Sequence, residues 1–462
     1  MTPGLFTEST VVNAKRPSPT SLASVRMDKL VIQGKHPLHG ALAVSGSKNT
    51  ALPLMAAALL ADGTTRLDNV PDLQDIATFA NVLRVSGADV KFDRDRRRLY
   101  LDASRIGFPE APYELVKKMR ASFYMLGALL GRCGEARVSL PGGCAWGPRP
   151  VNLHIEGIKA LGAEIDLDEG YVVARAPGGR LQGGSYTLEP SSVGATINIA
   201  LAAATARGTS RIENAAIEPD VVEFCKALEA MGARLHGIGT RTLDIEGVDA
   251  LQPITYRNCP DRIELGTFMI AAAIAGAPGE AIRITDADPE HLGEDFTEAF
   301  RRTGAALTAG EDFVEITAPD AIHPVSITTG IYPGFPTDLQ AQWTVLLTQA
   351  RGTATVTDTV YGDRFNHMPE LSRLGVRARV DGNTVTVEGG PPLKGAKVMS
   401  TDLRASVSLV LAGMVASGET HVLRIYHLDR GYERLEEKLS QAGVHIERAI
   451  YDEFARPEMS EA

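Results

Sequence analysis

Helix-like apolar stretches recur along this 462-residue chain with a period of about 70 residues. Six such openings start near residues 45, 118, 191, 261, 336 and 401. Examples are SGSKNTALPLMAAALL in the first and STDLRASVSLVLAG in the last. The most apolar of these helices are expected to be buried.

Each apolar helix is followed by a small turn, a short β-like run and a second helical pattern. The second pattern ends in Gly-Ala or Gly-Val at Gly87, Gly162, Gly232, Gly304, Gly375 and Gly443. Alternating runs such as ADVKFD and LYLDA come next and predict paired strands. Each unit therefore predicts the order β-α-β-α-β-β, in an α/β protein whose sheets face solvent.

Six units fit two domains of three units better than one domain of six. We expect residues 48–257 to form the first domain, and residues 27–47 to return and join 258–450 in the second. A cleft between the two domains is then the natural ligand site.

The two ends of the chain are expected to lie outside these domains. Residues 1–26 are rich in Ser, Thr and Pro and lack the apolar core of a signal peptide. They predict a disordered extension or a mis-assigned start ahead of Met27, with an organelle transit peptide as the alternative. Residues 451–462 are expected to be a flexible tail.

Composition narrows the possible partners. Lys and Arg number 47 against 57 Asp and Glu, a net charge of −10, which disfavours nucleic acid and anionic membranes. The longest apolar run, ALPLMAAALLA at 51–61, is too short to cross a bilayer. The four cysteines form no CxxC pair, which favours a reducing, cytoplasmic compartment, and the absence of HExxH or any His/Cys cluster predicts no metal.

Charged residues recur at the openings of the units. Lys48 and Asn49 open the first apolar helix, where free N–H groups favour anions. Arg120, Asp338 and Arg404 lie at or near the same place in later units, and later loops carry further arginines: Arg149, Arg364 and Arg430. Each arginine alone could be a solvated surface charge, but their periodic placement predicts that they converge on one cleft.

Cys144 lies in the loop SLPGGCAWGPRP, residues 139–150. The surrounding glycines and prolines leave no helix or strand to bury the thiol, and the loop could close over a substrate. A free thiol has a pKa of about 8.5, and a cation such as Arg149 would stabilise its thiolate. The loop therefore predicts a reactive cysteine rather than a buried one.

These motifs together resemble the UDP-N-acetylglucosamine 1-carboxyvinyltransferase family. The resemblance runs from Met27 to about Ile450 and rests on nine segments in order, among them PGGCAWGPRPVNLHIEGIKALGA, PDRIELGTF, GFPTDLQAQ and RIYHLDRGYERLEEKL. It implies a two-domain inside-out α/β barrel of six βαβαββ repeats. It also implies transfer of the enolpyruvyl group of phosphoenolpyruvate to the 3′-hydroxyl of UDP-N-acetylglucosamine, without metal or organic cofactor, at the start of peptidoglycan precursor synthesis in the cytoplasm.

The resemblance also assigns roles to residues. Cys144 is implied as proton donor, Asp338 as the carboxylate beside the sugar hydroxyl, and Lys48 and Arg430 as further catalytic residues. Phosphoenolpyruvate is expected to contact Lys48, Asn49, Arg149, Arg404 and Arg430. The nucleotide sugar is expected to contact Arg120, Arg149, Pro150, Val151, Asn152, Leu153, Ser192, Val193, Gly194, Asp338 and Val360. Asp402 and Arg364 are expected near the reacting centre, and Asp338 could equally be a helix N-cap.

Three positions depart from the usual pattern of the family. Asn152 stands where Asp is usual, Pro190 where many members have Lys, and Trp146 where a small or aliphatic residue is usual. Two of these lie on the nucleotide side, which keeps a UMP-type acceptor open as an alternative. 3-Phosphoshikimate is the other alternative acceptor, but the cysteine of the PGGC loop argues against it. Two alternative functions are not those of a transferase: an inactive regulatory homologue and a clamp on nucleic acid. The net charge of −10 opposes binding to nucleic acid.

Overall fold

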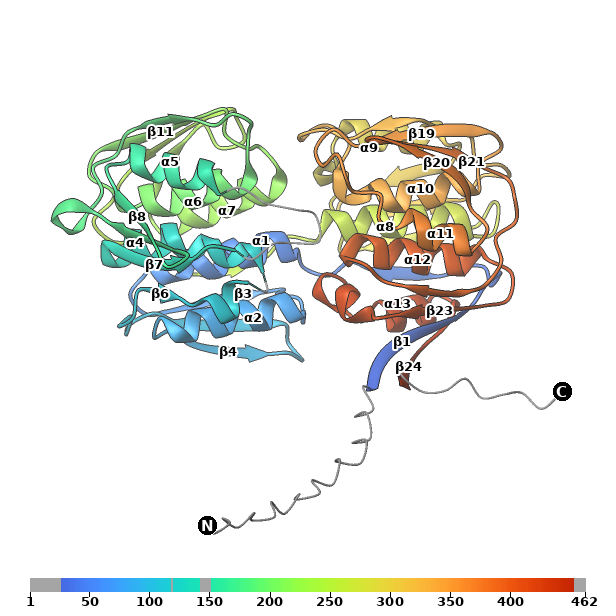
Figure 1. The fold of residues 1–462 in the computed structure, drawn as a ribbon, viewed down its shortest axis with the longest axis horizontal. Helices are drawn as coiled ribbons and strands as arrows, with labels where there is room; N and C mark the ends of the chain where they lie inside the picture. Colours follow the sequence, from blue (N-terminus) through green and yellow to red (C-terminus); the bar gives the residue numbers. More distant parts are fainter. Residues whose placement is uncertain (1–25, 118, 142–150, 453–462) are drawn as a thin grey trace, which may run out of the picture.

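The chain folds into two lobes of similar construction (Figure 1). The computed structural model describes residues 26–117, 119–141 and 151–452. One hydrophobic core is built from residues between Ala51 and Leu251. A second combines residues between Leu30 and Val44 with others between Ile263 and Ile446. We propose that residues 48–257 form the first domain, and that residues 27–47 and 258–450 together form the second.

The described part of the first lobe consists of three units, each with helices and a four-stranded sheet. Its helices are α1 (Lys48–Ala57), η1 (Ala58–Leu60), α2 (Gln74–Val85), α3 (Tyr113–Val116), η2 (Arg120–Tyr124), α4 (Met125–Cys133), α5 (Asn152–Ala160), η3 (Pro177–Gly179), α6 (Val193–Ala203) and α7 (Pro219–Ala230). Its strands are β3 (Thr64–Asp68), β4 (Asp89–Asp93), β5 (Arg98–Asp102), β6 (Glu110–Ala111), β7 (Glu135–Ser139), β8 (Glu164–Asp168), β9 (Tyr171–Arg175), β10 (Ser185–Thr187), β11 (Thr209–Glu213), β12 (Arg234–His236), β13 (Thr242–Glu246) and β14 (Thr255–Arg257).

The second lobe repeats this plan and takes in the start of the chain. Its helices are α8 (Arg262–Ala275), η4 (Pro289–Leu292), α9 (Glu294–Arg302), η5 (Thr337–Leu339), α10 (Gln340–Thr348), α11 (Met368–Arg373), α12 (Leu403–Val415), η6 (Ile425–Arg430) and α13 (Leu435–Gln441). Its strands are β1 (Arg26–Gln33), β2 (Ala41–Ala43), β15 (Ala281–Thr285), β16 (Ala306–Ala309), β17 (Phe313–Thr317), β18 (Ile327–Thr328), β19 (Thr353–Thr357), β20 (Arg377–Asp381), β21 (Thr384–Glu388), β22 (Lys397–Met399), β23 (Glu419–Leu423) and β24 (His445–Asp452).

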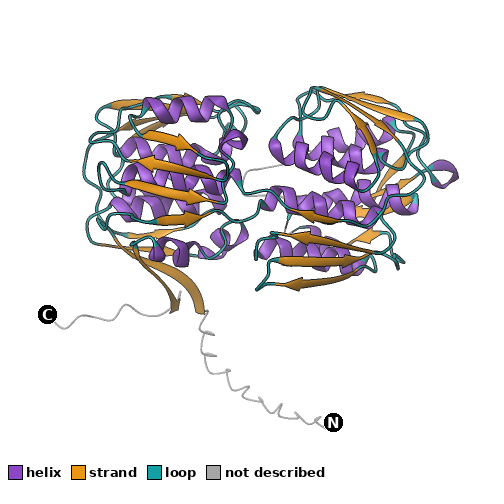
Figure 2. Ribbon diagram, turned by 180° about the vertical axis from the view of Figure 1, so that it is seen from behind, coloured by secondary structure: helices purple, strands orange, loops and turns teal. Residues whose placement is uncertain are grey.

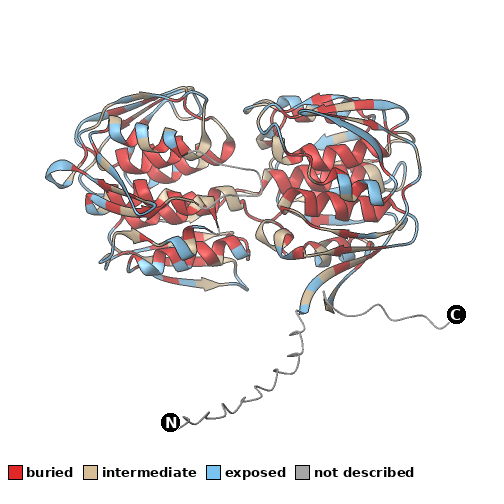
Figure 3. Ribbon diagram, in the orientation of Figure 1, coloured by how far each residue is buried: buried red, intermediate tan, exposed pale blue. Residues whose placement is uncertain are grey.

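Six four-stranded sheets form the outside of the two lobes, and the apolar helices lie inside them (Figures 2 and 3). In the order β10-β11-β13-β12, the first pair is parallel and the other two are antiparallel. Strand β11 alternates exposed and buried residues, as a sheet with one solvent face must. The predicted arrangement of buried helices and solvent-facing sheets is confirmed.

Small residues allow the central helices to approach one another closely. A Cβ added at Gly127 in α4 would lie 2.1 Å from the backbone oxygen of Asn198 in α6. No larger side chain fits between these two helices without moving them apart. Within the described ranges, no helix is long and apolar enough to cross a membrane.

The second helix of each unit ends where the Gly-Ala and Gly-Val pairs predicted. All six of these glycines have positive φ, for example +105° at Gly87 and +91° at Gly443. L-residues with a side chain rarely adopt this conformation, so glycine ends the helix and turns the chain toward the next strand.

The chain crosses between the lobes twice, along two adjacent segments. Residues 44–47 lead from β2 into α1, and residues 258–261 lead from β14 into α8. Ser47 N–H donates to the Cys259 carbonyl at 2.7 Å, and Asp261 N–H donates to the Ser45 carbonyl at 2.8 Å. Strand β2 pairs with β15, and β1 pairs with β23 and β24, so residues 26–43 belong to sheets of the C-terminal half.

Candidate active site

Asp75, in the first turn of α2, is held by two cations from different lobes. Its Oδ2 lies 3.2 Å from Lys48 Nζ, and its Oδ1 accepts from Arg430 Nε at 2.9 Å. The Asp75 side chain is only 6% exposed. Burial on its own raises the pKa of Asp75, but Lys48 and Arg430 outweigh burial and hold that pKa below its usual range. The carboxylate therefore stays ionised and holds the two cations together.

Asp338 is held in a similar way, by two arginines of the second lobe. Arg364 Nη2 donates to Oδ1 at 2.7 Å, and Arg404 Nη2 donates to Oδ2 at 2.8 Å. Both arginine side chains are below 10% exposed, while Asp338 retains 27% exposure. Burial raises the pKa of Asp338, and the two guanidiniums overcome this effect and lower the pKa well below the usual range.

The alternative prediction that Asp338 is a helix N-cap is wrong. Asp338 lies inside the short turn η5, whose N-cap is Pro336, and neither η5 nor α10 has a side-chain cap. The cap at this level of the second lobe is Asp402, which accepts the backbone N–H groups of Arg404 and Ala405 at the start of α12. Asp338 is free of a capping role because both of its oxygens pair with guanidiniums.

Val360 lies near the Asp338 group through a shared partner. Its backbone N–H donates to Asp358 Oδ1 at 2.9 Å, and Thr337 Oγ1 donates to Asp358 Oδ2 at 2.6 Å. Arg364 Nη1 in turn donates to Thr337 Oγ1 at 2.8 Å. Buried Asp358 thus ties the loop of Val360 to the turn that carries Asp338.

Three predicted nucleotide-sugar segments come together in the first lobe. Buried His154, next to Leu153 in α5, hydrogen-bonds through Nδ1 with Asn198 of α6 at 3.0 Å. A Cβ added at Gly194 would lie 3.0 Å from the His154 ring. Burial, together with the nearby charge of Arg120, lowers the pKa of His154 to about 3. Arg120 and the starts of α5 and α6 therefore surround one neutral histidine.

The remaining predicted residues follow the local structure. Ser47 caps α1 by accepting from Thr50 N–H, which places Lys48 and Asn49 in its first turn. Ser192 caps α6 by accepting from Ala195 N–H, ahead of Val193 and Gly194. Val151 is buried, while Asn152 and Pro190, two of the three departures from the family pattern, are exposed. Cys144, Trp146, Arg149 and Pro150 lie outside the described residues.

The described part of the site has two groups of cations that can bind anions, one at Asp75 and one at Asp338. In each group a carboxylate lies beside the cations. Lys48, Arg430, Arg364 and Arg404 supply four cationic groups around two ionised carboxylates. Guanidinium groups bind carboxylates and phosphates through paired N–H donors. A substrate with a carboxylate and phosphates fits this combination.

Curated proteins align with this sequence over nearly its whole length. The chain is 53% identical to the UDP-N-acetylglucosamine 1-carboxyvinyltransferase of Chloroherpeton thalassium, over 94% of this chain and all of that one. It is 54% identical to the enzyme of the same name from Chlorobium phaeovibrioides, over 93% of this chain and all of that one. The chain belongs to the UDP-N-acetylglucosamine 1-carboxyvinyltransferase family.

Wider comparisons agree with this membership and with the fold. Residues 32–439 match the family described as EPSP synthase (3-phosphoshikimate 1-carboxyvinyltransferase). The enolpyruvyl transferase NikO from Streptomyces tendae superposes with a TM-score of 0.81 at 27% identity, over 92% of this chain and 99% of that one. The fold is also that of EPSP synthase from Acinetobacter baumannii, which superposes with a TM-score of 0.71 at 18% identity. The superposition covers 92% of this chain and 100% of that one. The predicted six-unit, two-domain α/β fold and the resemblance to the carboxyvinyltransferase family are confirmed.

Sequence reasoning did not identify Asp75 or Tyr432, which contact site residues, or Glu433, which contacts Asp72, Ser45 and Arg97 beside the site. Arg404 Nη1 donates to the Tyr432 hydroxyl at 3.3 Å, and Asp75 pairs with Arg430. One signal for Asp75 was present: an aspartate opens the second helix of its unit, as Asp220 does in the third unit. Tyr432 and Glu433 follow Arg430 within two and three residues, but nothing in their spacing indicated where they point.

Proposed function

We propose that this chain transfers the enolpyruvyl group of phosphoenolpyruvate to the 3′-hydroxyl of UDP-N-acetylglucosamine and releases phosphate. The sugar oxygen bonds to C2 of phosphoenolpyruvate while C3 takes a proton, and loss of a C3 proton and of phosphate then restores the double bond. The chemistry needs anion binding, a base for the hydroxyl proton and an acid for C3.

The observation that carries the proposal is the pair of cation–carboxylate groups at Asp75 and Asp338. Lys48 and Arg430 lie together on Asp75, where they can hold the phosphate and carboxylate of phosphoenolpyruvate. Asn49 belongs to the same helix start, and Arg149 and Arg404 complete the proposed phosphoenolpyruvate contacts.

Asp338 is the proposed base. Its two guanidinium partners lower its pKa, so it is a weak base in this arrangement. An anionic substrate that binds Arg404 competes for that guanidinium and thereby raises the pKa of Asp338. Arg404 therefore links substrate binding to the base strength of Asp338. Arg364 remains paired with the other carboxylate oxygen of Asp338.

Cys144 is the proposed acid. Of the other three cysteines, Cys225 and Cys259 are buried and Cys133 lies at the end of α4. Burial raises the pKa of all three thiols, that of Cys225 to about 12, which makes them poor proton carriers near neutral pH. Cys144 alone lies in a Gly/Pro loop, which supports its assignment to the reaction.

The acceptor contacts and the cellular role complete the proposal. The nucleotide sugar would contact Arg120, Arg149, Pro150, Val151, Asn152, Leu153, Ser192, Val193, Gly194, Asp338 and Val360. The convergence of Arg120 with the α5 and α6 starts around His154 supports this set. We place the reaction in the cytoplasm, in peptidoglycan precursor synthesis, with these two small molecules as the partners of the enzyme.

A phosphate-release assay tests the proposal. Phosphoenolpyruvate is held fixed while UDP-N-acetylglucosamine, UMP and shikimate 3-phosphate are compared as acceptors. We expect UDP-N-acetylglucosamine to give the fastest release, and faster release with either other acceptor would overturn the acceptor assignment. Cys144→Ser should nearly abolish turnover while Cys144→Asp keeps more of it, because a serine hydroxyl is far too weak an acid. Full activity of Cys144→Ser would remove Cys144 from the mechanism.

A further inference from the structure

The short turn from Arg430 to Glu433 contacts the first lobe at two points. Arg430 Nε donates to Asp75 Oδ1 at 2.9 Å. Glu433 Oε1 accepts the backbone N–H of Asp72 at 2.7 Å. The contacts are three residues apart on both sides, so the turn lies against the start of α2 as a two-point clamp.

The second carboxylate oxygen of Glu433 extends this contact. Oε2 accepts the Ser45 hydroxyl at 2.8 Å and lies 3.2 Å from Arg97 Nη2. Ser45 belongs to the crossing segment between the lobes, and Arg97 to the turn between β4 and β5 of the first lobe. The Glu433 side chain is 4% exposed, and a carboxylate that is buried this far needs such donors to offset its lost hydration.

Tyr432, between the two, points into its own lobe. Its hydroxyl lies 2.9 Å from Thr267 Oγ1, and it accepts from Gln342 Nε2 at 3.2 Å and from Arg404 Nη1 at 3.3 Å. The same turn therefore contacts the Asp338 group through Tyr432 and the Asp75 group through Arg430.

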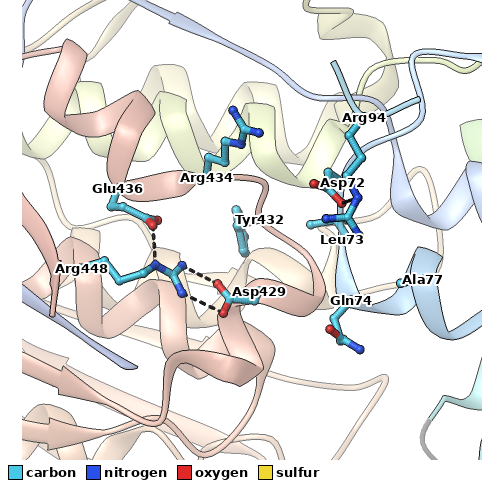
Figure 4. Close-up of a pocket in the computed structure, with 10 residues that line it drawn as sticks. All are labelled: Asp72, Leu73, Gln74, Ala77, Arg94, Asp429, Tyr432, Arg434, Glu436 and Arg448. Carbon is cyan, nitrogen blue, oxygen red and sulfur yellow. Dashed lines mark hydrogen bonds and ion pairs between the residues drawn. The ribbon is translucent and has the colours of Figure 1, made fainter. Parts of the chain in front are cut away.

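Apolar packing does not fill the space beside this turn. A pocket of about 290 Å³ opens there, lined by residues of both lobes: Asp72, Leu73, Gln74, Ala77, Arg94, Asp429, Tyr432, Arg434, Glu436 and Arg448 (Figure 4). On the side of the pocket, the turn and α2 are joined by the directed polar contacts of Glu433 and Arg430.

We infer that Glu433 is a positioning residue for Arg430, because it fixes the turn against α2 and so holds the Arg430 guanidinium beside Asp75 and Lys48. The Arg430 side chain is 32% exposed, whereas those of Arg404 and Arg364 are below 10%. The contacts of Glu433 attach the same turn to α2 at a second point and so restrict movement of the turn relative to Asp75. The inference rests on the proposed function, in which Arg430 and Lys48 bind phosphoenolpyruvate.

Glu436 offers a matched control. It lies in α13, three residues beyond Glu433, and its side chain is 13% exposed. Its Oε1 accepts from Arg448 Nε at 2.6 Å, and Arg448 also pairs with Asp429, all within the second lobe (Figure 4). Glu436→Gln therefore makes the same chemical change to a carboxylate that pairs with an arginine, without removing a contact to the first lobe.

The test compares Glu433→Gln with Glu436→Gln in steady-state assays that vary each substrate in turn. For Glu433→Gln we expect the KM for phosphoenolpyruvate to rise about tenfold or more, with the KM for UDP-N-acetylglucosamine and the melting temperature close to those of Glu436→Gln. A rise of both KM values together, or no rise beyond the control, would overturn the positioning role.

A double variant tests whether Glu433 acts through Arg430. If it does, Glu433→Gln should add little to the phosphoenolpyruvate KM of Arg430→Gln, because the positioned group is already gone. Additive effects of the two substitutions would overturn the inference. Wild-type protein without phosphate release would instead refute the proposed function, so the two failures are distinguishable.

Discussion

Asp75 and Asp338 are each held between two cations, but the partners come from different places. Arg364 and Arg404 belong to the same lobe as Asp338. Asp75 and Lys48 belong to the first lobe, whereas Arg430 reaches Asp75 from the second, 355 positions along the chain. The Asp338 group can therefore form within one lobe, while the Asp75 group requires both lobes to be in the correct relative position.

This difference suggests how the proposed reaction is arranged. The proposed base, Asp338, is paired with two arginines of its own lobe, which would give fixed electrostatics around the reacting hydroxyl. The Lys48–Arg430 pair is assembled from two lobes, which would couple the proposed binding of phosphoenolpyruvate to their relative placement. Substitutions in the two groups should accordingly affect different kinetic constants.

The largest effect is expected for Asp338→Asn. The amide keeps the size of the side chain but cannot take a proton, so kcat should fall by about 10²–10⁴-fold, the usual contribution of a positioned base. Binding of UDP-N-acetylglucosamine, measured by calorimetry, should change much less. A variant with near wild-type kcat would show that Asp338 is not the base. The proposed catalytic role of the Asp338 group would then be wrong.

Asp75→Asn should come next, with its main effect on phosphoenolpyruvate binding. Loss of the carboxylate leaves Lys48 and Arg430 as neighbouring like charges and removes an ion pair between the lobes. We expect the KM for phosphoenolpyruvate to rise by about 10- to 100-fold with a smaller change in kcat. A fall confined to kcat would contradict the proposed division of roles.

The pattern of the sequence was sufficient for the repeating parts of the molecule. Apolar openings and terminal glycines such as Gly87 predicted the helices and their ends, because burial and positive φ act within each unit. The prediction that Lys48 opens the first apolar helix is confirmed, because Ser47 caps that helix and α1 begins at Lys48.

Contacts between distant segments could not be predicted in this way. Asp75 pairs with Arg430 355 residues away, Glu433 with Ser45 388 residues away and Tyr432 with Thr267 165 residues away. Neither period nor composition encodes such pairs. The cap reading of Asp338 failed because Pro336 and the turn η5 open that helix, which leaves the carboxylate to the arginines. Periodicity reports burial, whereas the partner of a charged group depends on tertiary packing.

The pH dependence of stability should also reflect the two groups. Both folded-state pKa values lie below the usual range, so in acid the unfolded chain binds more protons than the folded one. Their stabilisation is complete above the unfolded pKa of about 3.9 and is lost as pH falls through the lower folded values. Each pKa unit of lowering corresponds to about 1.4 kcal/mol.

Denaturant unfolding between about pH 3 and pH 7 measures this effect. The free energy of unfolding of Asp75→Asn and of Asp338→Asn should fall less steeply in acid than that of the wild type. If the slopes are equal, the carboxylates do not carry the predicted ionisation difference.

The smallest expected effect concerns Asp402, which supports only the Asp338 group. Its Oδ1 accepts two N–H groups at the start of α12, the helix that carries Arg404. Asp402→Ala should lower the free energy of unfolding by about 1 kcal/mol, while Asp402→Asn, also a good cap, should lose much less. If the cap orients Arg404, the alanine variant should also reduce kcat a few-fold while leaving the KM for phosphoenolpyruvate less affected than Asp75→Asn does. The matched control is Asp288→Ala, which removes the side-chain cap of η4 in the same lobe at a residue outside the proposed site. Equal losses of kcat in the two alanine variants would mean that the cap only stabilises the helix.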